Sequence, residues 1–490
     1  MQLDATIRRQ LLFHPLRPVI VDDQRTWKAY EVLVASWHLA AEIRRQSQAG
    51  RIGIMLPTSG LFPVAILAAW ALGRTPIPLN YLLSKDDLAF VLADSGCDAV
   101  VTVGPMVDFV GGLPAGIREI RMDRMSFRGL PRPRFSSPLR EDDLATILYT
   151  SGTSGRPKGV MLTAANLDAN VRQCREWVGF GARDSVLGVL PQFHSFGLTV
   201  LTLLPLAVGG RAIYTAKFVP RRLLELARTH RPTTFVAIPS MYGALAALKS
   251  GGPDDLSSLR FAVSGGEPLP RTLSEEIHAK YGVRISEGYG LTETAPVTNW
   301  CRPDEFRPGS VGKPLPGIDE RIVGPDGKPV PPGTDGEIRI KGPNVMRGYL
   351  NRPEETAAVF DAEGYFRTGD MGRFDAEGHL HITGRIKEML IIAGENVFPR
   401  EIEGALERHP GVHAAAVIGV VDGSRGEVPV AYVEMREGHA FDETALRSHC
   451  RELIAQYKVP REIIRLDALP RNPTGKVLRK ELVKMHAARG

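Results

Sequence analysis

The sequence contains few cysteines, and this scarcity limits its redox and metal chemistry. Its 490 residues include four, Cys97, Cys174, Cys301 and Cys450, and none of them forms a C-x-x-C pair. Such wide spacing argues against a disulfide scaffold and against a zinc site. We expect buried thiols in a reducing cytoplasm.

Long hydrophobic runs are also missing. The longest apolar stretches, residues 61–73 and 196–210, are too short to cross a bilayer, and the N-terminal segment MQLDATIRRQ has no apolar signal core. We therefore predict a cytoplasmic protein without a transmembrane segment.

Charge of neither sign dominates the chain. Lys and Arg number 61 against 55 Asp and Glu, a net charge of +6, which is a weak argument for a nucleic-acid partner and fits small anionic ligands equally well. Hydrophobic residues make up 43% and charged residues 24%, enough for a sizeable core without bulk disorder. At ~150 residues per domain, the length suggests roughly two to four domains.

Helical and extended patterns alternate between Tyr30 and Gly290, which favours parallel strands joined by crossover helices. We predict a doubly wound α/β architecture with more than one sheet. The predicted strands are 51–56, 97–103, 144–150, 184–191, 211–215, 233–239, 259–266 and 284–290; the predicted helices are 30–46, 61–72, 84–94, 164–177, an apolar helix after residue 194, 221–230, 241–248 and 273–281.

Near Gly309 the pattern changes to short strands separated by Pro/Gly turns, in GKPLPGIDERIV, GEIRIKG and GHLHITG, which predicts an antiparallel sheet or small barrel. A small α+β module of about a hundred residues follows, the usual domain size. Its predicted elements are a helix over 399–408, strands over 413–421 and 427–435, and a helix that carries Leu446, Cys450, Leu453 and Tyr457 on one face.

A glycine-rich loop, TSGTSGRPKG, follows the strand at 144–150. Glycines let the backbone approach a ligand, while hydroxyls, exposed amides and Lys158 are suited to phosphate oxygens. The loop is not a Walker A sequence, because G-x-x-x-x-G-K-[ST] is absent, so a P-loop kinase or GTPase is only the second interpretation.

The loop belongs to a series of eight collinear segments. They are YTSGTSGRPKGVMLTAANL, PQFHSFGL, SGGEPL, EGYGLTET, GEIRIKGPNVMRGYLNRPEET, YFRTGDMG, GRIKEMLIIAGENVFPREIE and PRNPTGKVLRK. This series closely resembles the motifs of the adenylate-forming superfamily, which contains acyl-CoA synthetases, luciferases and nonribosomal-peptide adenylation domains. The resemblance covers nearly the whole chain and favours the branch of fatty-acid–CoA ligases.

The resemblance implies ATP, Mg²⁺ and CoA as ligands and assigns residues to them. Glu293 matches the Mg²⁺ ligand, with Thr150 nearby, and Thr292 matches an α-phosphate contact. Asp370 and Arg385 match the ribose contacts, for which an acceptor-only carboxylate is suited. The implied nucleotide-binding set is Thr150, Ser151, Gly152, Thr153, Ser154, Gly155, Lys158, Gly265, Gly266, Glu267, Glu287, Gly288, Tyr289, Gly290, Asp370, Arg385 and Lys387.

Two lysines of the C-terminal part carry the implied mechanism. Lys476, in PTGK, matches the adenylation lysine, which binds the attacking carboxylate and the α-phosphate. Lys387 matches a hinge at the junction of an N-terminal domain, 1–385, and a mobile C-terminal domain, 386–490. Rotation at the hinge would remove Lys476 and bring GENVFPRE to the site for the thiol of CoA or of a phosphopantetheine arm.

Three positions qualify the assignment. His194 is a candidate catalytic residue that orients the acyl carboxylate or opens the thiol channel, although a satisfied core histidine is an equal alternative. Ile391 replaces the second lysine of some relatives, which leaves the thioester step open. Glu287 stands where Gln is common, which affects the adenine contacts.

The acid and its acceptor are predicted less directly. Relatives that activate amino acids carry an Asp where this chain has FHSFG, so an amino acid is disfavoured. An apolar wall of Phe235, Ala237, Ile238 and Tyr242 favours a medium or long fatty acid. CoA is the preferred acceptor because 309–384 shows no obvious insertion. A carrier protein, luciferase-like oxygen chemistry, an inactive nucleotide- or lipid-binding homologue and a homodimer remain alternatives.

Overall fold

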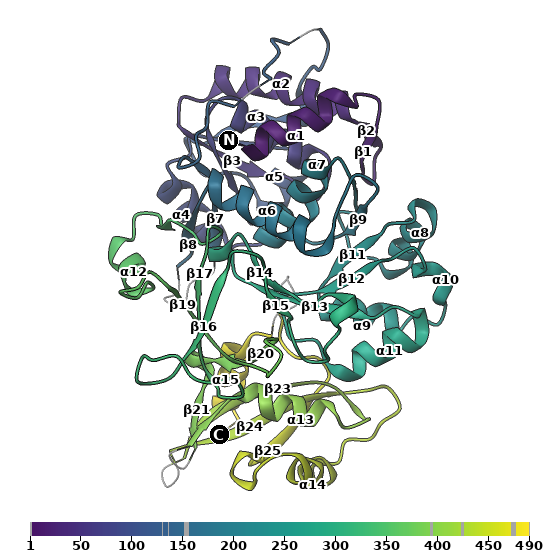
Figure 1. The fold of residues 1–490 in the computed structure, drawn as a ribbon, viewed down its shortest axis with the longest axis vertical. Coiled ribbons are helices and arrows are strands. Elements are labelled where there is room, and N and C mark those ends of the chain that lie inside the picture. Colours follow the sequence, from purple (N-terminus) through teal and green to yellow (C-terminus); the bar gives the residue numbers. More distant parts are fainter. Residues whose placement is uncertain are drawn as a thin grey trace.

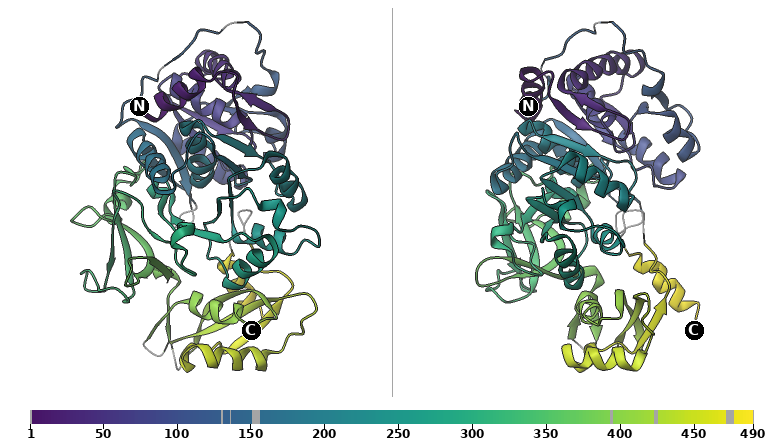
Figure 2. Two further views of the ribbon diagram at one scale, coloured as in Figure 1. Left: turned by 45° about the vertical axis from the view of Figure 1, so that its right-hand side comes forward. Right: turned by 90° about the vertical axis from the view of Figure 1, so that its right-hand side faces the viewer.

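The computed structural model describes residues 2–129, 131–135, 137–150, 156–392, 395–422, 426–471 and 477–489. The protein has an α/β fold with a large N-terminal part and a smaller C-terminal part, which lies at the lower end of the molecule in all views (Figures 1 and 2). No helix among the described residues is long and apolar enough to cross a membrane. The cysteine prediction is confirmed in that all four thiols are free and buried.

The largest sheet has nine strands in the order β15-β14-β13-β12-β11-β9-β10-β1-β2. Its strands from β13 to β1 pair in parallel, as the alternating pattern predicted, and its two ends are antiparallel. The strands are β15 (Lys313–Pro314), β14 (Val297–Trp300), β13 (Ile285–Gly290), β12 (Phe261–Ser264), β11 (Thr234–Ala237), β9 (Ser185–Gly188), β10 (Arg211–Tyr214), β1 (Pro18–Val21) and β2 (Thr26–Lys28).

Helices surround this sheet (Figure 1). They are α1 (Gln2–Phe13), α6 (Ala164–Val178), α7 (Leu204–Val208), α8 (Pro220–His230), α9 (Pro239–Ala246), α10 (Pro253–Leu256) and α11 (Arg271–Tyr281). Helix α6 begins at a capping box of Thr163 and Asn166, which satisfies amides that a helix leaves open. The apolar helix predicted after His194 is present, with a π-helical first part at Gly197–Leu203 that leads into α7.

A second, fully parallel sheet has the order β4-β3-β5-β6. Its helix α3 is apolar all round and buried almost throughout, as expected of a helix enclosed by protein. The elements are β3 (Arg51–Met55), β4 (Thr75–Pro78), β5 (Ala99–Thr102), β6 (Arg118–Arg121), α2 (Ala29–Gln46), α3 (Leu61–Ala71), α4 (Lys85–Ser95) and α5 (Gly104–Val110).

The strand at 144–150 does not lead directly to a crossover helix, which corrects the simple alternating pattern. This strand, β7 (Leu144–Thr150), forms an antiparallel hairpin with β8 (Lys158–Thr163), and β8 also pairs with β18 (Gly348–Tyr349). Lys158 stands opposite Thr150 in the register. The glycine-rich loop thus joins two strands, although Ser151, Gly152, Thr153, Ser154 and Gly155 lie outside the described residues.

The segment after Gly309 is antiparallel, as predicted, with the open order β16-β17-β19-β20. The strands β19 and β20 form a hairpin whose register places Asp370 opposite Arg385. The elements are β16 (Asp319–Val323), β17 (Gly336–Lys341), β19 (Phe366–Phe374), β20 (Leu380–Arg385) and the short helix α12 (Pro353–Ala358).

The C-terminal part is an α+β module built on a five-stranded sheet. Leu446 and Cys450 are buried as predicted, but Leu453 and Tyr457 are about 40% exposed, so the prediction of a continuous core face was wrong. Helix α14 ends at Leu453, and Tyr457 belongs to a separate turn with a different direction. The elements are β21 (Leu390–Ile392), β22 (Glu395–Val397), β23 (Val412–Asp422), β24 (Gly426–Met435), β25 (Glu462–Leu466), α13 (Pro399–Glu407), α14 (Glu443–Leu453) and α15 (Arg479–Ala487).

Candidate active site

A buried carboxylate joins two sheets at the centre of the candidate site. Asp370, which is 3% exposed, accepts a hydrogen bond from the Tyr289 hydroxyl at 2.7 Å and pairs with Nε of Arg385 at 2.8 Å. Burial, followed by the charge of Asp370, raises the pKa of Tyr289 well above its usual value, so its hydroxyl stays protonated and donates. The structure therefore brings together three residues that the motifs assigned to the nucleoside.

Thr292 and Glu293 follow β13 and face two different neighbours. The Thr292 hydroxyl lies 3.3 Å from the Ser195 hydroxyl, which connects EGYGLTET to the PQFHSFGL segment. Glu293 Oε1 accepts a hydrogen bond from the Tyr349 hydroxyl at 2.9 Å. Removal of water by the surrounding protein raises the pKa of Glu293, although the Tyr349 hydrogen bond acts in the opposite direction.

Lys158 reaches the same place from the β7–β8 hairpin. Its ammonium group forms an ion pair with Glu355 and lies 5.3 Å from the centre of the Tyr349 ring. Tyr349 thus contacts the phosphate-loop lysine with its ring and Glu293 with its hydroxyl. Sequence reasoning assigned no role to Tyr349 or Glu355, although both stand in the matched segment RGYLNRPEE.

Two glycines of the predicted adenine turn and motif have specific backbone requirements. Gly266 has a φ of +84°, in the left-handed region that side chains disfavour. A Cβ on Gly290 would lie 2.0 Å from the carbonyl oxygen of Pro296, so no larger residue fits without movement. Gly265 packs near Phe196, and Gly288 continues β13 beside β14.

Glu287 is a carboxylate in a poorly hydrated position. Its Oε2 is 3.4 Å from the amide of Leu269. Burial raises the pKa of Glu287 to about 7, although the nearby charge of Arg400 from α13 lowers it. Glu287, which stands where Gln is common in relatives, is therefore attracted to Arg400 of the C-terminal part.

His194 lies on the other side of Thr292, beside Ser195. Burial lowers the pKa of His194 to about 4, so its ring is neutral near pH 7. The ring contacts Phe193 at 4.7 Å between centroids, and Phe193 meets Tyr81 edge-on at 4.8 Å. Its Nε2 is buried without a hydrogen bond among the described residues, and the catalytic role of His194 stays a prediction.

The predicted apolar wall was wrong for most of its members. Phe235, Ala237 and Tyr242 are fully buried in the cluster that packs β11 against α8, α9 and α11. Phe235 and Ala237 share one face of β11, because alternate residues of a strand point to the same side, and Tyr242 of α9 packs against Phe235 on that face. Only Ile238 packs on the other side, 3.9 Å from where a Cβ on Gly266 would lie.

The C-terminal part contacts the N-terminal part through charged residues. Arg436 of the C-terminal part forms an ion pair with Glu276 of α11. Near the predicted boundary, the ring of Phe398 packs so closely on Gly384 that a Cβ there would lie only 2.6 Å from the ring. Lys387 lies in the short turn Ile386–Glu388, where burial, followed by the charge of Arg385, lowers its pKa. The boundary at 385/386 stays a prediction.

Lys476 lies outside the described residues, but its flanks are placed. Arg471 and Val477 pair as an antiparallel bridge. Arg479 forms ion pairs with Glu403 at 2.6 Å and with Glu388 at 3.3 Å. The negative charge of Glu267, in the predicted adenine turn, also raises the pKa of Arg479. Arg479, three residues after Lys476, thus contacts the turn Ile386–Glu388 and helix α13.

Comparison with protein families identifies this arrangement. The model of a family described as "AMP-binding enzyme" matches residues 7–350, and the model of its C-terminal domain matches residues 401–476. The chain belongs to the AMP-binding enzyme family. The resemblance to the adenylate-forming superfamily is confirmed.

Named relatives agree on the reaction and differ in the acid. A feruloyl-CoA synthase from Amycolatopsis is 37% identical over 88% of this chain and 88% of its own length. A long-chain-fatty-acid–CoA ligase from Bacillus subtilis is 40% identical over 70% of this chain and 62% of its own length. The crystal structure of ATP-bound MatB from Rhodopseudomonas palustris has a TM-score of 0.90 and 32% identity over 98% of this chain and 99% of that one.

The enzyme is an AMP-forming acid–thiol ligase that uses ATP and CoA. Mg²⁺ is typical of such enzymes, and Glu293 fits it chemically, because Mg²⁺ prefers carboxylate oxygens. Among the described residues, no Lys or Arg lies within ion-pair distance of Glu293. A bound cation would balance this poorly hydrated carboxylate.

Proposed function

We propose that the enzyme joins a medium- or long-chain fatty acid to CoA through an acyl-adenylate, with release of AMP and pyrophosphate. The observation that supports this acid is the neutral, apolar character of the segment beside Thr292. Burial keeps His194 uncharged, Phe193 and Ile238 are buried, and FHSFG contains no acid for an α-ammonium group. The relative from Bacillus subtilis is named for long-chain fatty acids.

The residues of the site divide the first half-reaction among them. Asp370 and Arg385 hold the ribose, Tyr289 lies along the adenine, and Thr292 contacts the α-phosphate. Glu293 and Thr150 hold Mg²⁺, which neutralises phosphate charge when it is bound. Lys476 binds the attacking carboxylate and the α-phosphate, so that two anions can approach each other. These assignments rest on matched motifs and on the contacts of Asp370 and Glu293.

The second half-reaction needs a different set of residues. After pyrophosphate has left, rotation at Lys387 would withdraw Lys476 and present the segment GENVFPRE to the thiol. Arg479 contacts Glu388, the residue after Lys387, and the ion pair of Arg436 with Glu276 also joins the two parts. CoA is the proposed thiol; a carrier protein is the alternative acceptor.

An aryl acid is the second candidate substrate. The ring of Phe193 lies 4.8 Å from that of Tyr81 and 4.7 Å from that of His194 between centroids, and such a series of rings offers edges and faces to a ligand ring. The relative from Amycolatopsis is named a feruloyl-CoA synthase and matches 88% of this chain.

The test is acid-dependent exchange of pyrophosphate into ATP across a panel of fatty acids of graded length, hydroxycinnamic acids and amino acids. We expect the highest rate of exchange with a medium or long fatty acid, and formation of the thioester when CoA is added in a separate assay. Preference for a hydroxycinnamic acid would replace the fatty acid by the second candidate, and activity with amino acids alone would contradict both. A Glu293→Gln variant serves as the background control.

A further inference from the structure

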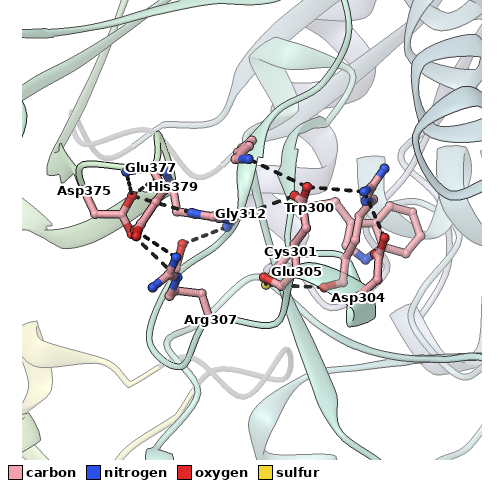
Figure 3. Close-up of polar contacts among 12 residues, drawn as sticks. Trp300, Cys301, Asp304, Glu305, Arg307, Gly312, Asp375, Glu377 and His379 are labelled. Atoms are coloured by element: carbon pink, nitrogen blue, oxygen red, sulfur yellow. Dashed lines mark hydrogen bonds and ion pairs between the residues drawn. The ribbon is translucent and has the colours of Figure 1, made fainter.

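The turn between β19 and β20 holds a cluster of metal-binding groups that the ligase reaction does not use. Its sequence is Asp375-Ala-Glu377-Gly-His379. One ligand atom each from Asp375, Glu377 and His379 lies within 4.8 Å of the others. Figure 3 shows these side chains gathered beside the segment that contains Glu305 and Arg307.

His379 is the unusual member of the cluster, because its ring is almost inaccessible and makes no hydrogen bond. The residue is 4% exposed, and neither Nδ1 nor Nε2 has a hydrogen-bond partner among the described residues. Leaving a buried polar group unsatisfied costs about 1–3 kcal/mol, so native structures rarely do it without a reason. Nδ1 lies 3.5 Å from Asp375 Oδ1, and Nε2 lies 4.0 Å from Glu305 Oε2.

Asp375 is already oriented by the backbone of its own turn. Its Oδ1 accepts hydrogen bonds from the backbone amides of Glu377 at 3.0 Å and His379 at 2.8 Å. Its Oδ2 lies 3.4 Å from Nε2 of His381, which places a second imidazole at the edge of the cluster.

The positive charge now beside these carboxylates comes from Arg307. An Nη2 of Arg307 lies 2.8 Å from Glu377 Oε2, and its Nε lies 3.9 Å from Asp375 Oδ2. The Arg307 side chain is 41% exposed, so it can turn into solvent when another cation replaces it. Two carboxylates and one imidazole would then face a single dication.

We propose that Asp375, Glu377 and His379 form a binding site for a first-row transition dication such as Zn²⁺, in competition with the Arg307 guanidinium. Imidazole together with carboxylate favours this class of ion over Mg²⁺ and Ca²⁺, which prefer oxygen alone. Zn²⁺ holds its ligands at about 2.0–2.2 Å, which puts neighbouring ligand atoms roughly 3.3 Å apart. Because the three ligand atoms now lie within 4.8 Å of one another, they must approach by up to about 1.5 Å.

The location indicates a structural role for this ion. The turn closes the hairpin whose other end carries Asp370 and Arg385. Arg307 precedes Gly309 by two residues, and the backbone of Gly309 forms a hydrogen bond with the Glu287 carboxylate. A bound ion would hold the three side chains of this turn together and so stabilise the end of the hairpin. The proposal does not depend on the acid substrate or on the ligase reaction, because the ion would bind the chain without ATP.

The experiment measures binding of Co²⁺ and Zn²⁺ alone to the full-length, tag-free protein without nucleotide. The readouts are the visible absorption of Co²⁺, calorimetric titration with Zn²⁺ and the rise in thermal stability that binding causes by mass action. We expect one ion per chain. Glu377 is 58% exposed, so Glu377→Gln should fold normally, and it should weaken binding by about tenfold or more, as should His379→Asn.

Arg307→Gln provides the sharpest control, because competition predicts a change in the opposite direction. Removing the guanidinium should strengthen binding by roughly threefold or more, which corresponds to the loss of one partly exposed like charge. His14→Gln removes an exposed histidine far from the cluster and should change nothing. Absence of Co²⁺ absorption, or binding that is indifferent to both Glu377→Gln and Arg307→Gln, would overturn the proposal.

Discussion

Tyr349→Phe removes one hydroxyl group from the site and leaves the ring in place. In the native enzyme this hydroxyl donates to Glu293 Oε1 at 2.9 Å, while the ring lies 5.3 Å from the Lys158 ammonium. A hydrogen bond to a charged group contributes about 1.5–3 kcal/mol, and 1.4 kcal/mol corresponds to a factor of ten. We therefore expect the variant to need about 10- to 100-fold more Mg²⁺ for half-maximal adenylate formation.

The assay is acid-dependent ATP–pyrophosphate exchange measured over a Mg²⁺ series at saturating ATP and acid. The KM for the acid should change little, because the lost bond acts on Glu293. Tyr365→Phe is the matched control, since it also removes a tyrosine–carboxylate hydrogen bond, to Asp319, at a distance from the site. An unchanged Mg²⁺ requirement in Tyr349→Phe, or an equal change in the control, would show that the hydroxyl does not position Glu293.

Three further variants test other parts of the site. Asp370→Asn removes the charge that Arg385 faces and should raise the KM for ATP by about tenfold or more. The control Asp335→Asn breaks the exposed ion pair with Arg373 and should leave the KM for ATP unchanged. The same KM for ATP in both variants would exclude the ribose role of Asp370. Burial raises the pKa of Glu287 to about 7, so the native state binds a proton more tightly than the unfolded state and loses stability as pH rises from about 4.5 to 7. The free energy of unfolding of Glu287→Gln should therefore rise by up to about 3 kcal/mol relative to that of the parent across this pH range. A difference in stability between the two proteins that is the same at every pH would contradict the raised pKa of Glu287. Lys387→Pro should preserve only one half-reaction, and normal turnover would remove the hinge hypothesis.

The parallel part of the fold could be predicted because buried strands and amphipathic helices leave clear local patterns. The strand β8 could not, because KGVMLT directly precedes α6 and carries no separate turn signal. Its pairing with β7 and β18 depends on contacts distant in sequence. The face of α14 was extended too far for a similar reason: the periodicity of Leu453 and Tyr457 continues through a helix end that only the folded chain defines.

The candidate site shows the same division. Motifs identified Asp370 and Arg385, and the hairpin register explains why they meet. Tyr349 has no sequence signal of its own, since its role arises from a strand that places it between Lys158 and Glu293. Phe235 and Ile238 look equally apolar in sequence, and only the folded chain assigns them to two different core clusters.

The most direct test of the account is the effect of Lys476→Ala on the two half-reactions measured separately. If this lysine serves adenylate formation from the C-terminal part, acid-dependent ATP–pyrophosphate exchange should be nearly abolished, while conversion of a supplied acyl-adenylate to the CoA thioester should be spared. Equal loss in both half-reactions would contradict the account.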